Sequence, residues 1–128
     1  MRLGASRFVA GETLDACVEV LRGLNEKGFY ANTTLLGEDV MDEAATAVVV
    51  DEYLRILERI EAEGLRVNVA VKLTHLGLDL GEALAQANVR KVVERAAELG
   101  NFIRIDMEYS AAVDPTLRIY HALREDGL

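Results

Sequence analysis

The sequence predicts an α/β fold in which one leading helix precedes three strand–helix units. Short stretches rich in β-branched and aromatic residues alternate with longer segments whose apolar residues recur every three or four positions. In addition, Gly28, Gly64 and Gly100 follow the first three predicted helices at an equal spacing of 36 residues. A glycine commonly ends a helix, so this spacing indicates a repeated unit.

Composition limits the classes of protein that this chain can represent. Its 128 residues are 51% hydrophobic and 28% charged, which predicts one small folded domain with a real core. The net charge of −8 argues against binding to nucleic acid. The single Cys17 predicts a packed thiol, without a disulfide. Since no apolar run is long enough for a membrane span and the start does not resemble a signal peptide, we expect a cytoplasmic protein.

The first half of the chain predicts two helices around one strand. After a lead-in over residues 1–11, the first helix begins with Thr13 as its N-cap. The first strand covers residues 29–36, and the second helix covers about residues 42–63. The apolar positions expected to face the core are Leu14, Cys17, Val18, Leu21 and Leu24 in the first helix, and Ala45, Val48, Val49, Tyr53, Ile56, Leu57 and Ile60 in the second.

The second half predicts two further strand–helix units. The second strand covers residues 67–73, and a loop follows over residues 74–78. Asp79, with Glu82 three residues later, resembles a capping box for the third helix. The inward positions expected in that helix are Leu84, Ala87, Val92, Val93 and Ala96. 

The last unit repeats the plan. Its strand covers residues 102–107, and Asp114-Pro115 predicts the start of the final helix. The inward positions expected in this helix are Leu117, Tyr120 and Leu123.

The pattern within the strands favours part of a (βα)8 TIM-type barrel over an open doubly wound sheet. Central strands of an open sheet are covered on both faces and are therefore aliphatic throughout. In residues 67–73 the valines alternate sharply with Asn68, Ala70 and Lys72. One face thus suits covering helices, and the other suits the lumen of a barrel. Three strands make only part of such a barrel, so we expect an incomplete one.

Lys72 and Asp106 are the candidate site residues that the strand pattern provides. Each lies at the carboxyl end of its strand, where barrel enzymes carry their chemistry. Lys72 could hold a substrate carboxylate, or it could simply extend from the rim into water. Asp106 could belong to the same substrate pocket as Lys72, or it could form an ion pair with Lys72 or Arg104.

Other motifs are weak or missing. His75 has no further His or Cys at metal-ligand spacing, so we expect no metal site and a local packing role for this side chain. The neighbours Glu38 and Asp39 fit a solvated turn. No glycine-rich phosphate loop occurs. A receiver-type signalling domain is disfavoured, because the first strand does not end in the carboxylate pair that phosphate acceptance needs.

Four blocks in order resemble bacterial proline dehydrogenases, which are FAD-dependent enzymes of proline catabolism. The blocks are Arg7–Thr13, Leu35–Glu38, Val71–Asp79 and Gly100–Glu108. The resemblance covers nearly the whole chain but only the amino-terminal part of the family's catalytic barrel. It implies that residues 1–128 form the amino-terminal fragment of a single barrel domain.

The resemblance also implies an activity. L-Proline would be oxidised to 1-pyrroline-5-carboxylate with hydride transfer to FAD, and the electrons would pass to a quinone at the membrane. The intact enzyme would then be cytoplasmic and peripheral to the inner membrane. By match of motif, Lys72 would bind the substrate carboxylate, Asp106 would act in catalysis near substrate and flavin, and Met107 would contact FAD.

The chain departs from the family at two matched positions. Thr34 stands where many members carry an aspartate. Tyr109 stands where many carry an aspartate or a glycine. The family's later strands and its carboxyl-terminal proline clamp have no counterpart in the sequence. We therefore expect the 128 residues alone not to oxidise proline. The alternative is a non-catalytic partial barrel that acts through partner binding, or through self-association at exposed sheet edges.

Overall fold

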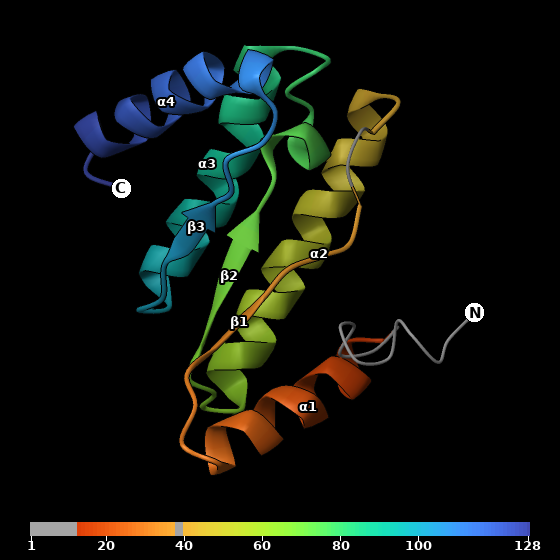
Figure 1. The fold of residues 1–128 in the computed structure, drawn as a ribbon, viewed down its shortest axis with the longest axis vertical. Helices are drawn as coiled ribbons and strands as arrows, with labels where there is room; N and C mark the ends of the chain where they lie inside the picture. The colour runs from red at the N-terminus through yellow and green to blue at the C-terminus, as the bar shows by residue number, and fades with distance from the viewer. Residues whose placement is uncertain (1–12, 38–39) are drawn as a thin grey trace.

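A computed structural model describes residues 13–37 and 40–128 and confirms the order of one helix followed by three strand–helix units (Figure 1). The three strands form a parallel sheet in the order β1-β2-β3. The elements are α1 (Leu14–Glu26), β1 (Ala31–Thr33), α2 (Glu43–Ala62), β2 (Val67–Val71), the 3₁₀ helix η2 (Leu73–Leu76), α3 (Glu82–Glu98), β3 (Ile103–Ile105) and α4 (Ser110–Glu125). The predicted lead-in and the turn at Glu38 and Asp39 lie outside the described residues.

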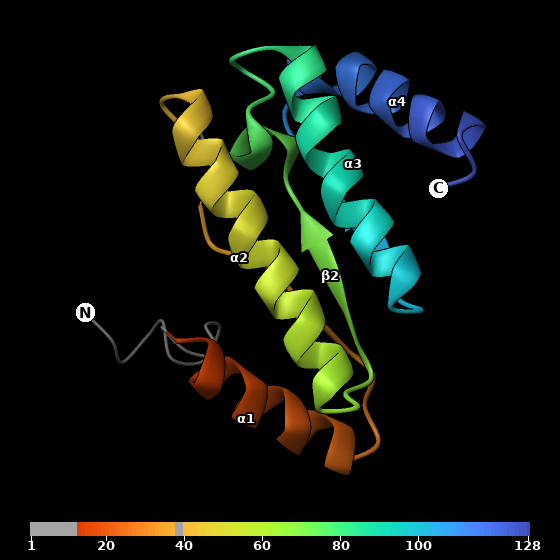
Figure 2. The same cartoon turned by 180° about the vertical axis from the view of Figure 1, so that it is seen from behind.

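One face of the sheet is covered by helices α2 and α3, as the alternation in β2 predicts. Figure 2 shows both helices in front of the sheet, whereas Figure 1 shows the strands from the opposite side. Val67, Val69 and Val71 of β2 are at most 6% exposed and belong to the core beneath these helices. The other face corresponds to the lumen side that the sequence predicts.

Ion pairs join consecutive helices along the outside of the fold. Each of the pairs α1–α2, α2–α3 and α3–α4 is bridged by at least one arginine and one carboxylate. These bridges are Arg22–Glu63, Arg59–Asp15, Arg95–Glu58, Arg90–Asp126 and Arg118–Glu82.

The predicted helix boundaries hold where local capping chemistry decides them. Thr13 Oγ1 accepts a hydrogen bond from the N–H of Ala16, and Asp42 Oδ1 accepts one from Ala45. Gly28, Gly64 and Gly100 all follow helices with φ values between 62° and 89°. A side chain would strain this left-handed conformation, which explains the glycine at each place.

The strands are shorter than predicted. β1 covers Ala31–Thr33 and not residues 29–36, because only these three residues pair with β2. Phe29 and Tyr30 are 58% and 77% exposed. Likewise, β3 covers Ile103–Ile105 and not residues 102–107. Aromatic and β-branched composition therefore overestimates the paired length.

The segment after β2 is a 3₁₀ helix and not the predicted end of a strand plus a loop. Strand β2 ends at Val71, and η2 turns over Leu73–Leu76. Leu73 and Leu76 are both fully buried. Three residues per turn place positions i and i+3 on the same side, so both leucines reach the core from one short turn.

Two predicted helix starts are wrong. The capping box at Asp79 does not form, because Gly81 is the N-cap of α3 and the Asp79 carboxylate instead accepts a hydrogen bond from Tyr109. Helix α4 begins at Ser110, so Pro115 lies inside it. The buried residues Ala112, Thr116, Ile119 and Leu123 form a stripe that includes the turn before the proline.

Five predicted core positions are also wrong, since the structure exposes Leu24, Val48, Ala87, Leu117 and Tyr120. The observed buried stripes overlap the predicted ones, and those of α2, α3 and α4 also include polar side chains. Thr46, Asn88 and Thr116 occupy buried positions that hydrophobicity does not reveal. Among the described residues, no helix has the length and apolar character needed to cross a membrane.

Candidate active site

Lys72 and Asp106 lie side by side just beyond the carboxyl ends of β2 and β3. The N–H of Asp106 donates a hydrogen bond of 2.9 Å to the carbonyl oxygen of Val71. This bond continues the parallel register, in which Val71 pairs with Ile105. Lys72 retains an extended backbone, with φ of −106° and ψ of 126°, so the alternation of β2 continues through it. Both residues are half-buried.

Tyr53 reaches this end of the sheet from α2. The side chain is fully buried, and its hydroxyl lies 3.4 Å from Thr34 Oγ1. Burial raises the pKa of the Tyr53 hydroxyl above its ordinary value, and the negative charge of Asp106 adds to the rise. Hydrogen bonds with Thr34 and with the backbone of Leu35 oppose it. Tyr53 therefore stays a neutral phenol close to the charge of Asp106.

His75 packs between Tyr53 and the segment that follows β1. Its ring meets that of Tyr53 edge-on, with centroids 6.3 Å apart. A Cβ added at Gly37 would lie 2.8 Å from His75 Nε2, so Gly37 leaves the space that the ring occupies. His75 is 8% exposed, in agreement with the local packing role that the sequence predicts for it.

Glu108 and Thr74 link the segments that follow β3 and β2. The Glu108 carboxylate accepts a hydrogen bond of 3.1 Å from the N–H of Thr74 and one of 2.5 Å from its hydroxyl. Thr74 is 1% exposed and lies within η2, two residues after Lys72. The carboxylate thus holds the turn that follows the candidate lysine.

A second polar network holds η2 from the side of the helices. Asn88 of α3 donates hydrogen bonds of 2.9 Å to the carbonyl of Leu76 and 3.0 Å to the hydroxyl of Thr46. Thr46 in turn donates to the carbonyl of Glu43 in α2. Since Asn88 is 5% exposed, these bonds satisfy a buried amide.

Polar side chains also cross the lumen face of the sheet. Asn68 Oδ1 accepts hydrogen bonds from Asn32 at 2.6 Å and from Arg104 at 2.9 Å, so all three strands are connected on that face. Met107 follows Asp106 and is 54% exposed. The large apolar side chain of Met107 is therefore accessible at the position directly after Asp106.

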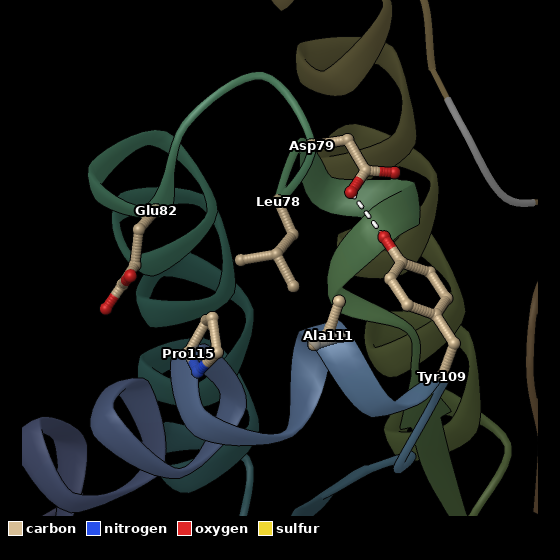
Figure 3. A pocket seen from close by; sticks show the side chains of 7 residues that line it. Leu78, Asp79, Glu82, Tyr109, Ala111 and Pro115 are labelled. Atoms are coloured by element: carbon tan, nitrogen blue, oxygen red, sulfur yellow. Dashed lines mark hydrogen bonds between the residues drawn. The ribbon is translucent and has the colours of Figure 1, made fainter.

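A pocket of about 340 Å³ lies between the segment before α3 and the start of α4 (Figure 3). The hydrogen bond between Tyr109 and Asp79 closes one side of it, and Leu78 points into it. Two hydrogen bonds from Arg118 hold the pKa of Glu82 below its ordinary value. The lining residues are Leu78, Asp79, Glu82, Tyr109, Ala111, Ala112 and Pro115, so Lys72, Asp106 and Met107 are not among them.

The described residues contain no group of three or more His, Cys, Asp or Glu side chains that could hold a metal ion.

Comparison with known proteins identifies the family. The sequence profile of the proline dehydrogenase family matches residues 17–127, which is most of the chain. The chain belongs to the proline dehydrogenase family. This match confirms the resemblance that the four sequence blocks suggest.

Curated proline dehydrogenases are similar over the same region. Proline dehydrogenase 1 of Bacillus subtilis (strain 168) is 34% identical over 125 residues, which cover 98% of this chain and 41% of the relative. Proline dehydrogenase of Deinococcus radiodurans is 34% identical over 122 residues, which cover 93% of this chain and 39% of the relative. The chain thus spans about two fifths of the length of these relatives.

A solved structure supports the fold. Proline utilization A (PutA) from Bdellovibrio bacteriovorus, inactivated by N-propargylglycine, superposes with a TM-score of 0.79 at 21% identity. The match covers 93% of this chain and 15% of that protein. The prediction of an α/β, TIM-barrel-type proline dehydrogenase fold, present in part, is confirmed.

Sequence reasoning missed the structural parts of this site. Tyr53 was assigned to the core and Thr74 to a loop, and Glu108 was noted only as part of a motif. The two strand-end segments 72–74 and 106–108 could have indicated the Glu108–Thr74 link, since parallel strands end at the same edge of a sheet. No sequence signal indicates that Tyr53 reaches over the strand ends.

Proposed function

We propose that this chain supplies the first part of a proline dehydrogenase active site, for the oxidation of L-proline to 1-pyrroline-5-carboxylate. The observation that carries the proposal is the pair of adjacent strand ends, where Lys72 and Asp106 lie together. Family membership supports the choice of reaction. The chain spans about two fifths of its relatives, so the remaining site groups would come from outside these residues.

Lys72 is the residue proposed to hold the proline carboxylate. Lys72 is half-buried at an extended strand end, and the alternation of β2 assigns its side chain to the lumen side, where partial removal of water would strengthen a charge-assisted hydrogen bond. Asp106 is the proposed catalytic partner. Its negative charge, one strand away, can orient the cationic amine of proline and the Lys72 ammonium.

FAD is the proposed cofactor, and it would accept the hydride from the proline ring carbon beside nitrogen. The described residues fit one contact with it. Met107 offers an accessible, polarisable side chain directly after Asp106, which suits a flat ring system. The proposal extends to a quinone acceptor at the membrane and to a cytoplasmic, peripherally bound enzyme, as the resemblance implies.

Replacement of Lys72 tests the carboxylate role. In the full-length protein, Lys72→Met should raise the KM for proline roughly 10- to 100-fold, because a hydrogen bond to a charged group contributes about 1.5–3 kcal/mol. Turnover of pyrrolidine, which has no carboxylate, should change little. Lys91→Met is the control, since Lys91 lies on the exposed side of α3. An unchanged KM for proline in Lys72→Met would exclude the anchor role.

A second candidate function is self-association of a non-catalytic partial barrel. Among the described residues, β1 and β3 each pair with β2 alone, which leaves the outer edge of each strand without a described strand partner. Such edges can pair with another chain. Light scattering coupled to size exclusion, measured over a range of protein concentrations, tests this. A monomer at all concentrations would contradict it.

A further inference from the structure

The position of Lys72 depends on the short helix that follows it. Lys72 is the N-cap residue of η2, but its side chain makes no capping hydrogen bond to that helix. Its backbone is held on one side by the pairing of β2 and on the other by the first turn of η2. Any shift of η2 would therefore move the lysine along the rim of the sheet.

Glu108 supplies the capping interaction that Lys72 does not. The carboxylate comes from the segment after β3, and each of its oxygens accepts one hydrogen bond from Thr74. Backbone N–H groups in the first turn of a helix lack partners within the helix, so a carboxylate there is stabilising. A carboxylate repels an anionic group of the substrate, so Glu108 is unsuited to contact it directly.

The far end of η2 is anchored independently. Asn88 donates a hydrogen bond to the carbonyl of Leu76. The next residue, Gly77, packs so closely against Leu84 and Thr46 that a side chain would not fit there. With Leu76 fixed to α3 and Val71 paired in the sheet, the first turn of η2 is the part next to Lys72 that Glu108 holds. Glu108 sets that end relative to β3 and hence relative to Asp106.

We propose that Glu108 is a positioning residue, which fixes Lys72 beside Asp106 through Thr74 and so sets the affinity for the carboxylate of the substrate. This inference rests on the proposed function, because it assigns Glu108 an effect on the same lysine. It differs from a purely structural role in one respect. The effect on substrate binding must depend on the presence of Lys72.

A double-mutant cycle in the full-length protein tests this dependence. Glu108→Ala should raise the KM for proline about tenfold, with a much smaller change for pyrrolidine. In the Lys72→Met background, the same substitution should change the KM for proline less than about twofold. Equal effects in both backgrounds, or equal losses on proline and pyrrolidine, would overturn the proposal.

Two milder variants keep the test valid if Glu108→Ala folds poorly. Thr74→Val keeps the shape and the backbone N–H bond but removes the hydroxyl bond, so it should raise the KM for proline by a smaller factor. Glu108→Gln retains an oxygen acceptor and should restore most of the affinity. Glu125→Ala, on the exposed end of α4, is the control carboxylate. An affinity in Thr74→Val equal to that of the unaltered protein would contradict the role of the hydroxyl bond, and a loss in Glu108→Gln as large as in Glu108→Ala would contradict the role of the oxygen acceptor.

Hydrogen–deuterium exchange separates failure of this inference from failure of the proposed function. Peptides that cover residues 72–76 should exchange faster in Glu108→Ala, whatever the substrate. If exchange does not change, the Glu108–Thr74 bonds do not hold η2 and the inference is wrong. If exchange rises but Lys72→Met binds proline normally, the proposed anchor is wrong, and the positioning role is overturned with it.

Discussion

Tyr53 illustrates how a single buried side chain joins the core to the site. Its ring is part of the core, whereas its hydroxyl meets Thr34 and its edge meets the ring of His75. Burial raises the pKa of the Tyr53 hydroxyl, and the negative charge of Asp106 adds a smaller rise, so a neutral phenol is the favoured form. Tyr53 therefore contributes to stability in a way that depends on pH.

The pH dependence of Tyr53 can be measured. Its pKa is raised in the folded chain, so the unfolded chain loses this proton first as the pH increases. The contribution of Tyr53 is present below the unfolded pKa of about 10 and is lost as the pH rises towards the folded value. In Tyr53→Phe, chemical denaturation should show a smaller loss of stability above pH 10 than in the unaltered chain. Tyr30→Phe, at a position 77% exposed, is the control and should keep the loss.

Gly77 is a second position where one side chain would matter. Its φ is +99°, and an added Cβ would lie 2.9 Å from Leu84 Cδ2 and 3.1 Å from Thr46 Cγ2. Gly77→Ala should therefore lower the free energy of unfolding by about 1–3 kcal/mol. Gly23→Ala is the matched control, since Gly23 lies within α1 with open space around it. That substitution should raise stability by about 0.5–1 kcal/mol, measured by urea denaturation.

At the scale of elements, the helices α2 and α3 and the turn η2 form one unit behind the site. Their apolar contacts are supplemented by the buried amide of Asn88, which joins η2 to both helices. A buried amide with partners on two elements specifies their relative position, in addition to any stability that it contributes.

Removal of this amide should loosen the unit. Asn88→Ala leaves the Leu76 carbonyl and the Thr46 hydroxyl without the donor that they share, and it should cost about 1–3 kcal/mol in thermal or chemical denaturation. Gln86→Ala, on the same helix but half-buried and without a described hydrogen bond, should have a smaller effect. A cost no larger than that of Gln86→Ala would show that the network does not stabilise the fold.

The sequence predicts the elements of this fold well and their ends less well. Order, parallel pairing and the glycine closures follow from local chemistry at positions such as Thr13, Asp42 and Gly64. The capping box at Asp79 failed because Tyr109, 30 residues away, takes that carboxylate. A contact between distant residues cannot be detected in a local pattern.

The candidate site was predictable to the same extent. Lys72 and Asp106 were expected at neighbouring strand ends, and the register of β2 and β3 places them there. Their proposed roles remain predictions. The parallel strand ends indicate that residues 72–74 and 106–108 lie close together, but the Glu108–Thr74 bonds themselves depend on the turn of η2, which the sequence does not predict.

At the scale of the whole molecule, β2 is the central element. It pairs with both other strands, and Val69 and Val71 are fully buried. Amides in such a strand open to solvent only with large-scale unfolding. Hydrogen exchange of this chain should therefore be slowest at Val69 and Val71 and faster at Ala31 in β1. Faster exchange in β2 than in β1 would contradict this order.

The equal 36-residue spacing of the helix-closing glycines also bears on how the chain acquires its structure during synthesis. The main contacts join elements of successive strand–helix units, as in β1 with β2 and α2 with α3. A ribosome adds residues at roughly 5–20 per second, so each strand–helix unit takes a few seconds to emerge. Helices and small packing contacts form far faster than that. Each new unit can thus dock on its predecessor before the next appears, and the growing sheet exposes one fresh edge at a time.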